Sequence, residues 1–161
     1  MPLPFPQVMF PDVTCISPAF LRENGIRGLL LDIDGTLMQT RDAMPRAEVL
    51  AWMERLRREG FFLYILSNNK HERRVRAFAE AVTLPWQHLA RKPLKRGFVR
   101  AFAETGLAPG ELAVVGDQIF TDMWGARRCG CRALLVESTD TYLWYFPLRR
   151  LFELPFRREK P

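Results

Sequence analysis

The 161-residue sequence is poor in cysteine and histidine and contains no long apolar run. Its three cysteines form no CxxC pair, and no second His or Cys is spaced with either of its two histidines to form a zinc site. We therefore expect free thiols in a reducing cytoplasmic compartment. No apolar segment approaches the roughly 20 residues of a membrane-spanning helix. The first residues lack the basic region of a secretory signal peptide, and prolines interrupt their apolar part.

Basic residues are in excess, with 24 lysines and arginines against 18 acidic residues and a net charge of +6. An anionic substrate or partner would account for this charge, as would an ordinary solvated surface, and composition leaves both explanations open. Hydrophobic residues make up 48% of the chain, which suits one compact domain with a full core. We expect one domain over residues 1–161, with a lead-in at 1–26, a catalytic core at 27–138 and an aromatic, basic tail at 139–161.

Apolar runs alternate with helical patterns along the middle of the chain. Strands are expected near 27–34, 61–66 and 112–117. Each contains an uninterrupted apolar run, at 28–31, 61–66 and 112–116, which is typical of parallel strands that are buried on both faces. Weaker strands are expected near 86–89 and 132–137. Helices are expected over about 18–21, 45–59, 71–82, 93–106 and 122–128, with Phe98, Val99 and Phe102 facing inward. This alternation predicts an α/β fold, with a doubly wound, Rossmann-like parallel sheet flanked by helices.

Polar residues stand where the predicted strands end. The carboxyl ends of the strands lie along one edge of such a sheet, and this is the edge where ligands bind. Asp32 and Asp34 are two residues apart, so an extended strand would direct both carboxylates to the same side. Two anions so close require a cation, a shared proton or a chemical task. The other polar residues at this edge are Ser67, Asn68, Lys92, Asp117 and Asp122.

These residue types suit phosphoryl transfer. We expect Asp32 to be the nucleophile that forms an aspartyl phosphate, because a carboxylate attacks phosphorus readily. Asp34 would protonate the leaving group and later deprotonate water. Lys92 and the Ser67 hydroxyl would neutralise the phosphate oxygens in the transition state. For Asn68 two roles stay open, support of the backbone and contact with the substrate.

The same edge predicts a magnesium site. Mg²⁺ prefers oxygen ligands and usually keeps several waters. Asp32, the backbone carbonyl of Asp34 and the Asp117 carboxylate are the expected protein ligands. Asp122 would be either a further ligand or a group that orients the others.

The order of these motifs resembles the haloacid-dehalogenase (HAD) superfamily. That family has four motifs, which this chain matches with Asp32-Ile33-Asp34-Gly35-Thr36, Ser67, Lys92-Pro93, and Gly116-Asp117 with Asp122. The resemblance implies a Mg²⁺-dependent phosphatase in which Thr36 also belongs to the substrate-binding set. Four stretches are similar to the YqeG-type branch of subclass IIIA of this superfamily: Ser67-Asn68-Asn69, Glu72-Arg73-Arg74-Val75, Ala90-Arg91-Lys92-Pro93 and 115–122.

That branch includes phosphatidylglycerophosphate phosphatases, so the resemblance implies a role in phospholipid biosynthesis. The chain differs from the branch at two places. Gly35 stands where the branch usually has Asn, and its usual GGNR stretch is here Gly125-Ala126-Arg127-Arg128. Neither difference removes a catalytic group.

The motif spacing indicates that no cap domain covers the site. About 30 residues separate Asp34 from Ser67 and about 25 separate Ser67 from Lys92, which leaves room for one helix and one strand each time. HAD caps are inserted in these two intervals. A site without a lid can accept a phosphate displayed on a large or membrane-embedded molecule.

Aromatic residues and arginines are interleaved over residues 142–158. Such a segment either contacts an anionic bilayer, which would place the protein on the inner face of the membrane, or packs on the core as a helix. Pro147 and Pro155 limit any continuous helix. Two other functions stay open: a phosphatase of a soluble sugar or nucleotide phosphate, and a non-catalytic basic module that binds RNA or protein. The intact acidic set disfavours nucleic-acid binding.

Overall fold

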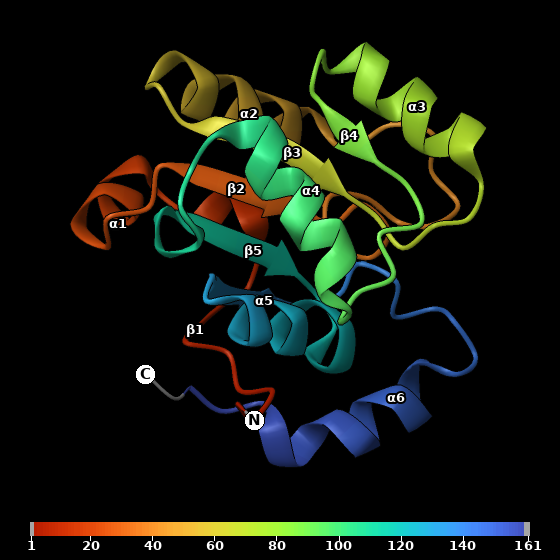
Figure 1. The fold of residues 1–161 in the computed structure, drawn as a ribbon. Coiled ribbons are helices and arrows are strands. Elements are labelled where there is room, and N and C mark those ends of the chain that lie inside the picture. Colours follow the sequence, from red (N-terminus) through yellow and green to blue (C-terminus); the bar gives the residue numbers. More distant parts are fainter. Residues whose placement is uncertain (1, 160–161) are drawn as a thin grey trace.

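The computed structural model describes residues 2–159, which form a single parallel sheet with helices on both faces (Figure 1). The sheet has six strands in the order β1-β6-β5-β2-β3-β4. The strands are β1 (Val8–Phe10), β2 (Gly28–Leu31), β3 (Phe62–Leu66), β4 (Trp86–Gln87), β5 (Leu112–Gly116) and β6 (Arg132–Val136). The α-helices are α1 (Pro18–Glu23), α2 (Ala47–Arg58), α3 (Glu72–Ala81), α4 (Lys95–Thr105), α5 (Trp124–Cys129) and α6 (Phe146–Glu153). The predicted doubly wound α/β fold is confirmed.

Strand β2 lies at the centre because its side chains are apolar on both faces. Leu29 and Leu31 point into one core, where they pack with residues of α2 such as Leu56. Leu30 points to the other face and packs in a second core with Phe98 of α4. This alternation follows from the period of two residues along a strand. Every residue of β2 is buried, as expected for a central parallel strand.

The chain order reverses at β2, which pairs with β3 on one side and with β5 on the other. From β2 the chain builds β3 and β4 outward in one direction, then returns to build β5 and β6 in the other. A crevice forms at such a reversal, outside the carboxyl ends of the strands. Asp32 follows β2 and Asp117 follows β5, so both acids lie at this reversal.

Two details of the fold differ from the sequence-based expectations. The lead-in contains a strand, β1, which pairs in parallel with β6 and extends the sheet. Val99 of α4 is 58% exposed rather than inward, because Phe98 and Ala101 define the buried face of that helix. Within residues 2–159, no helix is long and apolar enough to cross a membrane.

The two ends of the chain meet at the outer edge of the sheet. The Met9 amide of β1 donates to the Glu159 carboxylate at 3.0 Å, and the rings of Phe5 and Phe156 lie 5.6 Å apart. The C-terminal segment therefore packs against the protein near β1, while α6 (blue in Figure 1) lies along the lower side of the molecule.

The cysteines allow a test of the core. Cys15 is exposed, whereas Cys131 is buried, and burial raises the pKa of the Cys131 thiol to about 12. At pH 8 the Cys131 thiol is therefore almost entirely protonated in the folded protein. We expect iodoacetamide to modify Cys15 within minutes and Cys131 only after unfolding in guanidinium, as measured by peptide mass spectrometry. Equal rates at the two sites in the native protein would contradict this packing.

Candidate active site and metal centre

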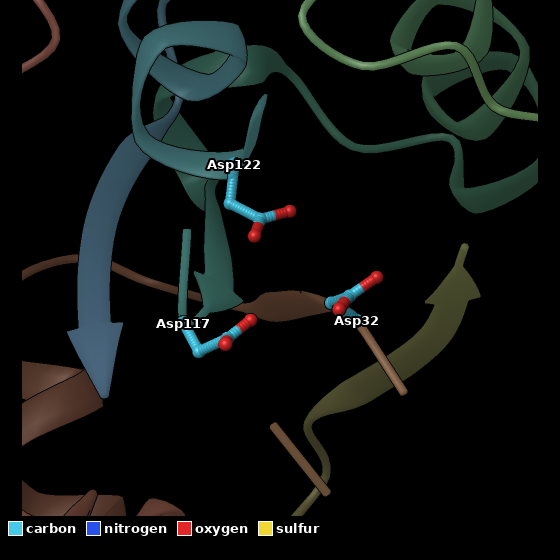
Figure 2. A group of neighbouring side chains, drawn as sticks. All are labelled: Asp32, Asp117 and Asp122. Carbon is cyan, nitrogen blue, oxygen red and sulfur yellow. The ribbon is translucent and has the colours of Figure 1, made fainter. Parts of the chain in front are cut away.

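Three buried carboxylates converge at the point where the strand order reverses. Asp32 follows β2, Asp117 follows β5, and Asp122 lies in a π-helical turn, Ile119–Met123, that leads into α5. One oxygen from each carboxylate lies within 4.8 Å of the others. Figure 2 shows the three side chains directed into a common space. Three carboxylates so arranged suit a hard divalent cation such as Mg²⁺.

A glycine allows Asp122 to approach the strand. Gly116 is the last residue of β5, and a Cβ atom there would lie 2.3 Å from the Asp122 carboxyl carbon. The Gln118 amide donates to Asp122 Oδ2 at 3.2 Å and fixes the rotation of this carboxylate. The absence of a side chain at Gly116 therefore brings Asp122 into the cluster.

Lys92 bridges two of the three acids. Its ammonium nitrogen lies 2.6 Å from Asp32 Oδ1 and 2.6 Å from Asp122 Oδ1, and its side chain is only 2% exposed. Asn68 holds the backbone of Lys92 at both polar groups: its Oδ1 accepts from the Lys92 amide at 2.7 Å, and its Nδ2 donates to the Lys92 carbonyl at 3.1 Å. The side chain of Asn68 thus supports the loop that carries Lys92, and its contact with the substrate stays a prediction.

Burial dominates the electrostatics of the cluster. It raises the pKa of Asp32 to about 8 against the opposing attraction of Lys92, and it raises the pKa of Asp117 to about 6. Burial by itself lowers the pKa of Lys92, but the attraction of Asp122 and Asp32 outweighs it and raises that pKa. Buried acids whose ionised forms are disfavoured in this way gain from a neighbouring cation. The electrostatics therefore agree with the donor set that a divalent metal requires.

The Asp34 carboxylate lies outside this cluster, contrary to the expectation that it shares one space with Asp32. It accepts from Asn69 Nδ2 at 2.8 Å and from the Arg74 guanidinium at 2.8 Å. The reason is that β2 ends at Leu31, so the alternation of a strand does not continue to Asp34. Its side chain is 21% exposed, which gives it access to water. The role of its backbone carbonyl as a metal ligand stays a prediction.

Ser67 and Thr36 lie at the site in different environments. Ser67 is buried directly after β3, where its hydroxyl accepts from the Asn69 amide at 3.0 Å. Thr36 is also buried, and its hydroxyl lies 3.4 Å from Asp117 Oδ1 as a long hydrogen bond. Thr36 thus contacts an acid of the metal centre, and the assignment of both hydroxyls to the substrate stays a prediction.

Three residues that contact the acids were missed by sequence reasoning. Asn69 and Arg74 hold Asp34, and both fall in stretches that carry the YqeG-type resemblance, so a signal was present. Arg149 of α6 donates to Asp117 Oδ2 at 3.0 Å. It lies 32 residues from its partner in a segment rich in arginine, and no local pattern distinguishes it.

Comparisons with known proteins identify relatives of this chain. A family model described as HAD-hydrolase-like matches residues 89–141. The "Probable phosphatase YqeG" of Bacillus subtilis (strain 168) is 34% identical over 134 residues, which cover 81% of this chain and 77% of that protein.

Similar solved structures include an uncharacterized protein from Listeria monocytogenes serotype 4b, with a TM-score of 0.59 and 18% identity over 67% of this chain and 76% of that one. The cobalt-bound deoxy-D-mannose-octulosonate 8-phosphate phosphatase of Haemophilus influenzae aligns with a TM-score of 0.56 and 13% identity, over 70% and 69% of the two chains. At these identities the structures support the fold alone.

The contact between Gly116 and Asp122 yields a prediction about metal binding. Gly116→Ala should displace Asp122 from the cluster and weaken Mg²⁺ binding by about tenfold or more, as measured by isothermal titration calorimetry. Gly110→Ala is the matched control, because no atom lies within 4 Å of a Cβ built there. Affinities within twofold of each other for the two variants would contradict the assignment of Asp122 to the metal centre.

Proposed function

Since the chain belongs to the HAD superfamily, within its capless YqeG-type phosphatases, we propose that it is a Mg²⁺-dependent phosphomonoesterase which acts on a phosphorylated lipid at a membrane surface. The observation that carries the chemistry is the cluster of Asp32, Asp117 and Asp122 with Lys92 beside it. A non-catalytic binding module would have no use for this buried set of charges. The preferred substrate, from the resemblance, is phosphatidylglycerophosphate.

In the first half-reaction, an oxygen of Asp32 attacks the phosphorus atom while the ester P–O bond breaks. The leaving alkoxide takes a proton from the Asp34 carboxyl group. Asn69 and Arg74 fix Asp34 for this transfer, and its partial exposure lets it exchange protons with water. Lys92, already in contact with Asp32, is placed to neutralise oxygens of the transferring phosphoryl group.

In the second half-reaction, Asp34 takes a proton from a water molecule that attacks the aspartyl phosphate. The bond between phosphorus and the Asp32 oxygen breaks, which releases inorganic phosphate and restores the carboxylate. Mg²⁺, held by Asp32, Asp117 and Asp122, would supply neutralising charge for the phosphoryl oxygens in both steps. The buried environment strengthens these electrostatic interactions because water is excluded.

The exposed face of the C-terminal segment supports a membrane-bound substrate. One side of α6 and its flanks contacts the core, through Arg149 and the buried Glu153. The other side presents large apolar residues to solvent, with exposed fractions between 55% and 86%: Trp144, Leu148, Leu151, Phe152 and Leu154. An amphipathic helix of this kind lies in the interface of a bilayer, and the net charge of +6 favours anionic lipids. In this proposal the tail packs on the core through one side and meets the membrane with its exposed apolar side.

A soluble phosphate monoester is the alternative substrate, and one observation favours it. A cavity of about 530 Å³ lies beside the loop that follows Asp34. Its polar lining includes Gln39, Arg41, Ser138 and Thr141. A space of this size can hold a small sugar or nucleotide phosphate.

The nucleophile is tested with an aryl phosphate. We expect the wild-type protein to hydrolyse p-nitrophenyl phosphate when Mg²⁺ is added and to stop when EDTA removes the metal. Asp32→Asn should lower kcat by at least about 10³-fold, because the amide is a poor nucleophile. Glu54→Gln is the control, since Glu54 is exposed on α2 and pairs with Arg57 and Arg58 of the same helix. Full activity of Asp32→Asn would refute the assignment.

The lipid substrate is tested by changing the exposed face of α6. Leu148→Gln with Leu151→Gln should lower binding to phosphatidylglycerol vesicles, and turnover of phosphatidylglycerophosphate in them, by about tenfold or more. Hydrolysis of p-nitrophenyl phosphate should stay within twofold. Val99→Gln, which changes an exposed apolar residue of α4, is the control. Efficient turnover of soluble sugar or nucleotide phosphates with no lipid turnover would favour the alternative.

A further inference from the structure

Arg149 connects the C-terminal helix to the most buried acid of the metal centre. Its Nη2 donates to Asp117 Oδ2 at 3.0 Å, and Asp117 has no exposed surface. The guanidinium is held on other sides as well. Its central carbon lies 5.2 Å from the centre of the Phe146 ring, and its Nε lies 3.9 Å from Glu153 Oε1. The side chain is only 18% exposed, so this contact is part of the interior.

A second contact of α6 reaches the turn that carries Asp122. Glu153, which is 1% exposed, accepts from the backbone amide of Ile119 at 3.1 Å. Ile119 is the first residue of the turn that contains Asp122. Arg157 holds Glu153 in place at 3.4 Å and pairs with Glu137 at 2.7 Å. Through these contacts, α6 fixes one metal-site acid directly and the backbone of another.

Asp117 has little freedom to rotate while Arg149 is in place. A Cβ atom at Gly35 would lie 2.7 Å from the same oxygen, Oδ2, so the backbone of the first motif borders this oxygen closely. Thr36 is the neighbour of the other oxygen, at 3.4 Å. Figure 2 shows the Asp117 carboxylate facing the other two acids. When a carboxylate binds a metal ion, a residue that hydrogen-bonds to this carboxylate typically contributes tenfold to a hundredfold to the metal affinity.

We propose that α6 is a structural part of the metal centre and that Arg149 is a positioning residue, which holds Asp117 in the orientation that binds the divalent cation. This inference deepens the proposed function and rests on it. Because Arg149 of α6 holds an acid that binds the metal, docking of the helix on the core and metal binding stabilise one another. The same helix carries the exposed apolar face. The C-terminal segment thereby couples the surface that meets the lipid to the site that performs the chemistry.

The test measures metal affinity directly, without substrate. Mg²⁺ or Mn²⁺ is titrated calorimetrically into the full chain. Arg149→Gln should weaken binding by about tenfold, and Arg149→Lys should restore part of the loss, because an ammonium group replaces one of the lost donors. Arg58→Gln is the control, since the Arg58 side chain is exposed on α2 and pairs with Glu54 of the same helix. Its affinity should stay within twofold of wild type.

Hydrogen exchange of the α6 amides supplies a second readout. Mg²⁺ should slow exchange over Phe146–Glu153 in the wild type and leave it unchanged in Arg149→Gln, which a loss of helix stability alone would not produce. Equal or tighter metal binding by Arg149→Gln would overturn the inference while the proposed metal centre stands; tighter binding would mean that the guanidinium competes with the cation. Absence of metal binding by the wild type would instead overturn the metal centre and the inference with it.

Discussion

Concentrated negative charge at the carboxyl ends of β2 and β5 constrains the rest of this structure. Three acids are removed from water in a space whose ligand oxygens lie within 4.8 Å of one another. Isolated carboxylates do not stay ionised in such a place, since burial disfavours their charged forms. Lys92 and Arg149 enter from two different segments and neutralise part of the charge. The proposed divalent cation would neutralise the remaining charge, so burial that is costly without the metal would favour its binding.

Several residues hold these charged groups in the positions that the cluster requires. Asn68 holds the loop of Lys92, and Gly116 admits Asp122 to the strand end. Asn69 and Arg74 hold Asp34 apart from the buried acids, near water. The two acids of the first motif therefore lie in different environments: Asp32 is buried, and Asp34 is partly exposed to water. Such a division suits two tasks in one reaction, because a nucleophile and a proton carrier require different surroundings.

Sequence reasoning identified the sheet because its central strands are apolar on both faces, a pattern that half-exposed strands do not show. It placed Asp32, Lys92 and Asp117 together because parallel strands end at the same edge. It missed β1, whose three half-buried residues form a strand only because β6 offers a free edge. It also missed Arg149, since a pairing over 32 residues leaves no local periodicity. What escaped prediction was decided by tertiary contacts.

The pairing of β1 with β6 has a consequence for the order of folding. Strand β1 precedes the other five strands of the sheet in the sequence, but its partner is β6, which follows more than a hundred residues later. The central strands and their helices can associate during synthesis, because their contacts are closer in the sequence. Strand β1 must wait until β6 emerges, and the contact between Met9 and Glu159 forms later still. Completion of this edge of the sheet is therefore expected to be a late step in folding.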